Sequence, residues 1–403
     1  MTGKLDFHLL QFVPEPLPTF RADVAVMFGK YLPRHRIHCH LAGRRGTGGP
    51  SAQQYSAVDM PAPARSQWGR ELAYCAMVVR IMARASRQRY DLVQVRDMVT
   101  IGVLVLLFAR LKGIPFAYWM SFPMCESRIA RARAQLRARP SLKQLLVLAK
   151  GKFESFLLYK ILLPAARHVF VQSDAMGAAV AARGIDPAKL SSVPMGVDTE
   201  VLRPQDVVPR RPEGWEAAPL VAYLGTLDRL RELHVAIDAL ALVRHDFPEA
   251  KLLLIGDASA PADVQDLLDH ARRRGVGEAV RVTGWMAPAQ AWELLAGADA
   301  AISYIPRGIL FDVSSPTKLL EYLAMAMPSV GNDNPDQAQV LDGSQAGWLT
   351  ASDAGAMAAA LSAIFADRAQ ARARAASGPG FIERHRSYRV LAETLASRYK
   401  QLI

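Results

Sequence analysis

The feature that most constrains the fold is a regular alternation of short apolar runs and longer helical stretches, which occurs in two series along the chain. In the first series the predicted strands are residues 5–12, 35–41, 91–95, 115–120, 167–172 and 190–194. In the second series they are residues 220–224, 251–255, 279–283, 300–303 and 328–331. Helices predicted between strands include residues 68–87 and 174–183. This alternation is typical of α/β domains, in which helices cover both faces of a parallel sheet.

A segment rich in proline separates the two series. Residues 204–219 contain four prolines and a glycine among mixed charges, and they follow neither the helical nor the strand period. We therefore predict two doubly wound, Rossmann-like domains, residues 1–205 and 206–379, that face each other across a cleft. Ligands are expected in that cleft, at the carboxyl ends of the strands. A final helix predicted at about residues 381–402 leaves open whether the segment 380–403 crosses back to the first domain.

The formal net charge of +12 favours anionic partners. Residues 127–153 contain no acidic residue and eight basic ones, which are Arg128, Arg131, Arg133, Arg137, Arg139, Lys143, Lys150 and Lys152. Because leucines and phenylalanines recur there at helical spacing, we predict an amphipathic stretch over residues 128–163 that lies on an anionic membrane surface. The alternative is a helix that packs its apolar stripe on the domain core. No nucleic acid partner is expected, because the segment has few aromatic residues and matches no known binding module.

The apolar runs and the cysteines bear on the cellular compartment. The longest uncharged apolar run covers residues 99–109, whereas a transmembrane helix needs about 20 residues. Cys39, Cys75 and Cys125 are scattered and form no C-x-x-C pair, so we expect reduced thiols and no metal site. We predict a cytoplasmic protein that associates, if at all, only peripherally with the inner face of the cell membrane.

The segment with the most candidate chemistry is residues 312–324. Ser314 or Ser315 can cap a helix there, and Pro316 suits its first turn. A helix N-terminus binds phosphate well, and Lys318 adds a positive charge. Glu321 offers a carboxylate suited to a pair of sugar hydroxyls. The alternative is an ordinary capped helix on which both charged side chains are solvated.

Turns after the predicted strands of the second half supply further candidates. Gly225 follows the strand 220–224, and Arg229 and Arg231 lie in the loop after it, where two guanidinium groups can hold a diphosphate. Residues 256–257 and 284–288 form similar turns that can flank a base. Surface arginines and plain turns are the alternative interpretation.

In their order and spacing these segments resemble the retaining glycosyltransferases of family 4, which have the two-domain architecture called GT-B. The resemblance covers residues 167–350, with a looser match of the first half. It includes residues 167–173, 193–198, 225–231, 252–257 and 298–303, and it is clearest at residues 315–328 and 335–337.

The resemblance implies a sugar transfer from a nucleotide-sugar donor to a lipid-linked or polysaccharide acceptor, with retention of the anomeric configuration and without a metal or cofactor. Glu321 would bind the ribose of the donor, and Arg231 and Lys318 would stabilise the charge that develops on its diphosphate. Arg229 would assist at the diphosphate. The backbone of Ser315, Pro316 and Thr317 would contact the phosphates and sugar, and Met286 would lie near the base.

The chain departs from the family pattern in both halves. Val313 stands where the family has the first of two glutamates, and Ala326 stands where a glycine is usual. In the first half Ser121 replaces a frequent histidine, and a glycine-rich loop is absent at residues 17–23. Arg21, Asp23 and Ser121 are the acceptor-side candidates, with a structural role as the alternative. These departures keep two other functions open, a nucleotide-sugar epimerase and a non-catalytic partner subunit.

Overall fold

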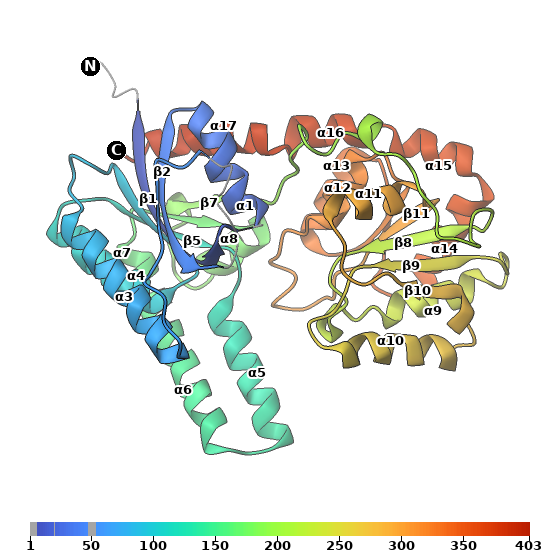
Figure 1. The fold of residues 1–403 in the computed structure, drawn as a ribbon, viewed down its shortest axis with the longest axis horizontal. Coiled ribbons are helices and arrows are strands. Elements are labelled where there is room, and N and C mark those ends of the chain that lie inside the picture. The colour runs from blue at the N-terminus through green and yellow to red at the C-terminus, as the bar shows by residue number, and fades with distance from the viewer. Residues whose placement is uncertain (1–5, 20, 47–53) are drawn as a thin grey trace. The chain divides into compact units, whose positions relative to one another are not determined.

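The computed structural model describes residues 6–19, 21–46 and 54–403, which form two α/β units (Figure 1). The first unit consists of Met1–Met195 and Tyr388–Ile403, and the second of Gly196–Ser387. The boundaries between the units therefore lie at residues 195–196 and 387–388, whereas the boundaries predicted from the sequence are 205–206 and 379–380. The C-terminal segment belongs to the first unit.

The first unit is built on a parallel sheet of seven strands in the order β3-β2-β1-β4-β5-β6-β7. The strands are β1 (Phe7–Leu17), β2 (Ile37–Arg45), β3 (Ala57–Asp59), β4 (Leu92–Arg96), β5 (Phe116–Met120), β6 (His168–Val171) and β7 (Leu190–Ser192). All six strands predicted for this half are present, although residue 5 lies outside the described residues. The edge strand β3 was not predicted, because three residues are too few to show an alternation.

Helices flank this sheet, and serine side chains cap several of them. The helices are α1 (Ala22–Ala25), η1 (Met27–Tyr31), α2 (Leu32–Arg34), α3 (Gln67–Arg84), α4 (Val99–Leu111), α5 (Met124–Ala138), α6 (Leu142–Leu157), η2 (Leu158–Leu162), α7 (Leu163–Ala165), α8 (Asp174–Ala181), η3 (Pro187–Lys189) and α17 (Tyr388–Lys400). The hydroxyls of Ser66, Ser141 and Ser173 accept hydrogen bonds from backbone N–H groups in the first turns of α3, α6 and α8. Tyr399 of α17 packs its ring against Phe7 and Phe170, at centroid distances of 5.6 and 5.1 Å. Helix α17 is thus part of the core of the first unit.

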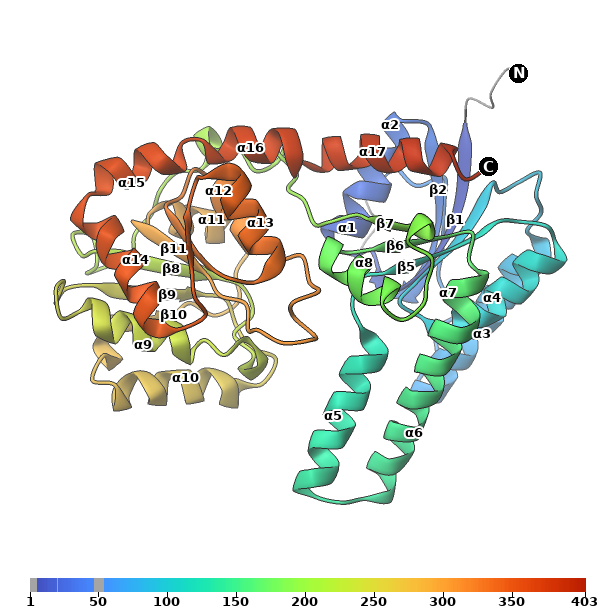
Figure 2. The same ribbon diagram turned by 180° about the vertical axis from the view of Figure 1, so that it is seen from behind.

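Helices α5 and α6 form an antiparallel hairpin that extends away from the sheet of the first unit (Figures 1 and 2). The two helices approach closely at Gly151, where a Cβ atom would lie 3.0 Å from Cγ1 of Ile129. An ion pair between Arg128 and Glu154 joins them. On α6 the apolar side chains of Leu142, Leu145, Leu146, Phe153 and Phe156 are exposed.

The second unit has a parallel sheet of six strands in the order β10-β9-β8-β11-β12-β13. The strands are β8 (Leu220–Leu224), β9 (Lys251–Ile255), β10 (Val280–Val282), β11 (Ala300–Ser303), β12 (Ser329–Asn332) and β13 (Trp348–Thr350). The helices are η4 (Pro204–Asp206), η5 (Arg229–Arg231), α9 (His234–Val243), α10 (Pro261–Arg273), η6 (Gly277–Ala279), α11 (Pro288–Ala296), α12 (Lys318–Ala324), α13 (Pro335–Ser344), α14 (Ala354–Ala366), α15 (Arg368–Ala375) and α16 (Gly378–His385). The five predicted strands are present, and β13 is again a three-residue edge strand that was not predicted.

Two predicted helix starts are wrong. Helix α12 begins at Lys318 after Thr317, whereas Ser314 and Ser315 had been predicted as caps. The hydroxyl of Ser314 donates a hydrogen bond to the backbone carbonyl of Phe311, and Ser314 lies three residues before the N-cap position at Thr317. The predicted final helix is two helices, α16 and α17. The Gly-Pro-Gly at 378–380 does not precede the first of them but forms the first turn of α16, where proline is favoured. Within the part of the chain that the structure describes, no helix is both long enough and apolar enough to cross a membrane.

Candidate functional site

Three glycines with positive φ lie at the carboxyl edge of the second sheet, each just after a strand. Gly225, Gly256 and Gly284 follow β8, β9 and β10, with φ angles of 146°, 142° and 75°. A Cβ atom on Gly256 would lie 2.0 Å from the carbonyl oxygen of Gly225, and one on Gly225 would lie 2.1 Å from Cε of Lys318. A side chain at any of the three positions is therefore strained by the backbone conformation, and at Gly225 and Gly256 it would also collide with neighbouring atoms. The glycines let the backbone and Lys318 converge on one point at the strand ends.

Lys318, the first residue of α12, extends its side chain to this point. Its Nζ lies 4.7 Å from the centroid of the Tyr223 ring. Withdrawal from water, together with the smaller effect of the positive charge of Arg231, lowers the pKa of Lys318 to about 7, although the nearby Glu321 carboxylate opposes this shift. Arg231 and Lys318 therefore lie within electrostatic range of each other. Two neighbouring cations beside a strand end are suited to a group that carries more than one negative charge.

Glu321 lies one turn after Lys318 on α12. Burial raises the pKa of its carboxyl group to about 7, while the charge of Lys318 opposes this shift. Among the hydrogen bonds and ion pairs of the described residues, none involves the Glu321 carboxylate. A half-buried carboxylate in this position can accept two hydrogen bonds from a diol.

The two arginines of the loop after β8 differ in their surroundings. Nε of Arg231 donates a hydrogen bond to Oγ1 of Thr226 at 3.2 Å, which fixes its guanidinium group near Gly225. Arg229 is exposed, and its backbone N–H donates to Asp263. The structure therefore brings Gly225, Arg231 and Lys318 together and leaves the Arg229 side chain outside this group.

The loop that leads into α12 is anchored by a hydrogen bond to a buried ion pair. Oγ of Ser315 donates a hydrogen bond to Oδ2 of Asp336 at 2.8 Å, and Asp336 forms an ion pair with Arg386 at 2.7 Å. The Ser315 hydroxyl is thus directed at Asp336, and the backbone of Ser315, Pro316 and Thr317 continues from it into the first turn of α12.

A cavity of about 250 Å³ lies beside this group at the same sheet edge. It is lined by Leu224, Gly225, Thr226, Ile255, Gly256, Asp257, Trp285, Met286 and Ala291. The Trp285 side chain is 80% exposed although it borders the cavity. Met286 thus lies in a turn that lines the same cavity as Gly225.

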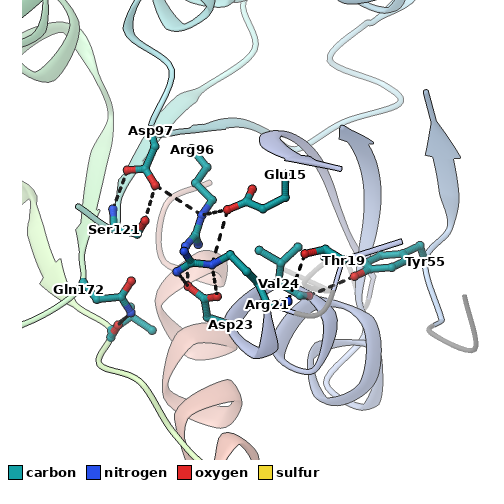
Figure 3. Close-up of polar contacts among 11 residues, drawn as sticks. Glu15, Thr19, Arg21, Asp23, Val24, Tyr55, Arg96, Asp97, Ser121 and Gln172 are labelled. Carbon is teal, nitrogen blue, oxygen red and sulfur yellow. Dashed lines mark hydrogen bonds and ion pairs between the residues drawn. The ribbon is translucent and has the colours of Figure 1, made fainter. Parts of the chain in front are cut away.

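The first unit has its own polar cluster at the carboxyl edge of its sheet, and it contains all three acceptor-side candidates. Figure 3 shows Arg21, Asp23 and Ser121 around the buried guanidinium group of Arg96. Nη2 of Arg96 lies 2.6 Å from Oδ2 of Asp23, and Nε lies 3.2 Å from Oε1 of Glu15 and 3.6 Å from Oδ2 of Asp97. Arg21 pairs with Asp23 at 3.1 Å and with Glu15 at 3.6 Å.

The direction of the pKa shift differs among the carboxylates of this cluster. Burial alone would raise the pKa of Asp23, but Arg96 and Arg21 hold it below its ordinary value. Burial raises the pKa of Glu15 and of Asp97, and Arg96 only partly offsets this. Despite burial, these carboxylates raise the pKa of Arg96, which stays charged. The sequence did not single out Glu15, Arg96 and Asp97 as site residues. The last two stand at the end of a buried strand, which is a position typical of ligand sites in α/β sheets.

Two family models match the chain. The model described as "Glycosyltransferase Family 4" matches residues 22–201, and the one described as "Glycosyl transferases group 1" matches residues 218–367. A D-inositol 3-phosphate glycosyltransferase of Segniliparus rotundus is 34% identical over 119 residues. That match covers 28% of this chain and 26% of the relative, so it spans about a quarter of the relative's length.

Several solved structures have the same fold at low sequence identity. The HepE protein of Anabaena, in complex with UDP and glucose, has a TM-score of 0.69 and 15% identity, and the likeness covers 98% of this chain and 100% of that one. Sucrose-phosphate synthase of Thermosynechococcus elongatus has a TM-score of 0.68 and 17% identity, with 98% and 99% covered. WaaG, a glycosyltransferase involved in lipopolysaccharide biosynthesis, has a TM-score of 0.66 and 14% identity, with 97% and 99% covered. The prediction of two doubly wound α/β domains is confirmed.

Proposed function

Because the chain belongs to the group 1 glycosyltransferases of family 4 and has their GT-B fold, we propose that it transfers a sugar from a nucleotide-sugar donor to an acceptor with retention of the anomeric configuration. The observation that carries the proposal is the convergence of Gly225, Arg231, Lys318 and Glu321 at one sheet edge. A nucleoside diphosphate has the matching chemistry, a charged diphosphate next to a ribose diol.

The donor would bind at this edge in a defined order. Arg231 and Lys318 would hold the diphosphate, and the neighbouring backbone of Pro316 and Thr317 would contact its oxygens and the sugar. Glu321 would accept hydrogen bonds from the two ribose hydroxyls. The base would enter the cavity of about 250 Å³ beside Trp285 and Met286. Because the Anabaena protein was solved with UDP, UDP is the first nucleotide to test.

The transfer step requires stabilisation of the negative charge that develops on the leaving group. As the bond from the sugar to the diphosphate breaks, negative charge grows on the diphosphate, and two fixed cations lower the free energy of that state. Attack on the same face of the sugar would give retention, with the leaving phosphate accepting the proton of the acceptor hydroxyl. We propose that Arg231 and Lys318 supply this stabilisation without a metal, and activity that persists in EDTA would support it.

The donor site is tested by calorimetry with UDP, GDP and ADP. We expect one nucleotide to bind the wild type and Glu321→Gln to weaken it by roughly 10- to 150-fold, since hydrogen bonds to a charged group contribute about 1.5–3 kcal/mol. Glu278→Gln, on the exposed surface of the same unit, is the control and should leave the affinity unchanged. Equal affinity of the Glu321→Gln variant and the control would remove Glu321 from the donor site.

We also propose that the α5–α6 hairpin docks on an anionic membrane, which suits a lipid-linked acceptor and a cytoplasmic protein at the inner face of the cell membrane. The apolar side chains of α6 that recur at helical spacing are exposed, not packed on the core. They are Leu142, Leu145, Leu146, Phe153 and Phe156, here called the α6 stripe. Lys143, Lys150 and Lys152 flank the stripe and are exposed as well. An apolar stripe bordered by lysines is typical of helices that lie in a membrane interface.

Helix α3 adds to this surface. Its Trp68 and Leu72 side chains are exposed on one face of the helix. Arg44 holds the pKa of Glu71 below its usual range, and Lys150 of α6 contributes to that shift, which places the start of α3 near α6. An exposed tryptophan at the start of a helix near α6 is a common anchor at the level of lipid headgroups.

Vesicle sedimentation tests this surface. Wild-type protein should bind vesicles that contain phosphatidylglycerol more strongly than vesicles of phosphatidylcholine alone, and 0.5 M salt (roughly a 4 Å screening length) should weaken the binding. Leu146→Glu and Phe153→Glu should reduce binding, whereas Leu111→Glu, an exposed leucine at the end of α4, should not. Equal loss in all three variants would show that the α6 stripe has no special role.

Two other functions give different outcomes in these experiments. A nucleotide-sugar epimerase would convert the donor in the absence of any acceptor, and Val313 at the position of the first family glutamate is the observation that keeps it in view. A non-catalytic partner subunit would bind no nucleotide in a folded sample.

A further inference from the structure

A cavity of about 290 Å³ lies between helices α5 and α6 of the hairpin (Figures 1 and 2). Small-molecule sites have volumes of roughly 300–1,000 Å³, so this cavity has the size of a small site. Most of its wall belongs to α5 and to Phe122 just before that helix, and Val147 closes it from α6. The cavity is therefore a feature of the hairpin, and it is separate from the candidate donor site in the second unit.

Three polar side chains form one wall of the cavity. Ser127, Arg131 and Gln135 line it, and because they recur every four residues they share one face of α5. Each can donate a hydrogen bond, from a hydroxyl, a guanidinium and an amide group. Nη2 of Arg131 makes only a long contact of 3.5 Å with Oγ of Ser127. The first turn of α5, at the positive end of the helix dipole, borders the same space. This wall is suited to an anion.

Arg131 has a positive charge that is available to a ligand. Its side chain is exposed, and of the acidic side chains that the structure describes none pairs with it. The second arginine of the wall, Arg128, forms an ion pair with Glu154 of α6. The acid in the first turn of α5, Glu126, is paired with Arg183 at 2.9 Å. The charges around the cavity therefore balance except for that of Arg131.

The remaining wall is apolar, which indicates what kind of anion fits. Phe122, Met124 and Val147 line the cavity, and Met124 is 43% exposed. Val147 directly follows Leu146 of the α6 stripe in the sequence. A free phosphate ion gains nothing from apolar walls, whereas a phosphate ester with an apolar body also buries apolar surface there. A phospholipid has both parts, and its acyl chains can continue along the exposed apolar side chains of the hairpin.

We propose that the cavity between α5 and α6 binds the phosphate of an anionic phospholipid and so holds the hairpin on the membrane at one defined lipid. Arg131 pairs with the phosphate, and the Ser127 hydroxyl and the Gln135 amide donate hydrogen bonds to it. Arg128 stays paired with Glu154 and forms part of the wall. The inference rests on the proposed docking of the hairpin on an anionic membrane, and it adds a site for a single lipid to that surface.

Two variants of α5 with the same change in charge test the cavity on vesicles that contain phosphatidylglycerol. Arg131→Gln removes the charge in the cavity, and Arg133→Gln removes an equal charge from an exposed position of the same helix outside the cavity. We expect Arg131→Gln to weaken vesicle binding by roughly 10- to 150-fold, and Arg133→Gln by about fivefold, the effect of one surface charge. Equal losses would overturn the proposal, because only the net charge of the hairpin would then matter.

Dihexanoyl-phosphatidylglycerol, kept below its micelle concentration, probes the cavity by NMR titration without a membrane. It should bind the wild type, and about tenfold or more weakly Arg131→Gln and Val147→Trp, which fills the cavity without changing the charge. Circular dichroism reports whether each variant is folded, and either variant decides the question alone. No binding to the wild type, or unchanged binding to both folded variants, would overturn the proposal. Inorganic phosphate that binds as tightly as the lipid would make this a site for free phosphate, against the proposal.

The same samples separate this inference from the proposed function. Arg131 belongs to the first unit and the donor residues to the second, so Arg131→Gln should bind the nucleotide as the wild type does. If the wild type binds the soluble lipid but no vesicles, the membrane docking fails and the cavity remains a phospholipid site. If vesicle binding depends on the α6 stripe but is equal in Arg131→Gln and Arg133→Gln, the docking stands and only the lipid site fails.

Discussion

Replacing Gly225 by alanine should disable the donor site while leaving the protein folded. The added Cβ would lie 2.1 Å from Cε and 3.0 Å from Nζ of Lys318, so the lysine side chain must leave its place over the Tyr223 ring. The clash is with the flexible end of a side chain, which can move without disturbing the sheet. Gly275→Ala is the matched control, because Gly275 has a φ of 74° but nothing within 4 Å of its added Cβ.

The two substitutions should differ in binding more than in stability. Positive φ costs an alanine about 1–2 kcal/mol at Gly275 and about 1–3 kcal/mol at Gly225, so both variants lose a similar free energy of unfolding. Only Gly225→Ala displaces Lys318 from the diphosphate. The loss of one hydrogen bond to a charged group, about 1.5–3 kcal/mol, weakens nucleotide affinity by roughly 10- to 150-fold.

Urea denaturation and calorimetry with the nucleotide that binds the wild type measure the two effects separately. Gly275→Ala should be less stable and bind normally, whereas Gly225→Ala should be less stable and bind weakly. If folded Gly225→Ala binds as tightly as Gly275→Ala, then Lys318 does not contact the diphosphate and the reasoning is refuted.

Three further predictions concern stability, each measured by urea denaturation. Ala326 has a φ of 52°, so Ala326→Gly should stabilise the protein by about 1 kcal/mol, whereas Ala324→Gly, inside α12, should destabilise it; the reverse order would contradict the backbone argument. Arg96→Met should lower the free energy of unfolding by about 3–5 kcal/mol, because it leaves buried carboxylates uncompensated. Arg21→Met should lower it by about 1 kcal/mol or less, because the Arg21 side chain is 45% exposed; similar losses in the two variants would speak against the buried cluster. Burial raises the pKa of Glu321 from 4.5 to about 7, so ionisation destabilises the folded state and the wild type should lose stability relative to Glu321→Gln as pH rises from 4.5 to 7; a constant difference would indicate an unshifted carboxyl group.

The candidate residues of the second unit could be singled out from the sequence because they lie in short contiguous segments. Lys318 and Glu321 are three residues apart in one helix, and Gly225 directly follows a clear strand. The helix start was misplaced because α12 begins at Lys318, beyond both serines, and the Ser315 hydroxyl instead bonds to Asp336 across 21 residues of chain. A local pattern does not reveal such a partner.

The ion pairs of the cluster in the first unit were beyond local reasoning for the same physical reason. Arg96 and Asp23 are 73 residues apart and meet only because β4 and α1 adjoin in the fold. The exposure of α6 was also undecidable, since an amphipathic period is the same on a membrane as on a core. At Ala326 the structure explains why a glycine is usual in the family: the φ of 52° is left-handed, and the alanine of this chain is the strained choice.

The most direct test of the account is transfer itself. Wild-type protein and Glu321→Gln are incubated with the labelled sugar nucleotide whose base was found by calorimetry, together with membranes that contain phosphatidylglycerol and neutral glycolipids. The account predicts that the wild type moves label into the glycolipid fraction and releases the nucleoside diphosphate, and that the variant loses most of this transfer. A wild type that binds the sugar nucleotide but returns it unchanged, or only isomerised, would contradict it.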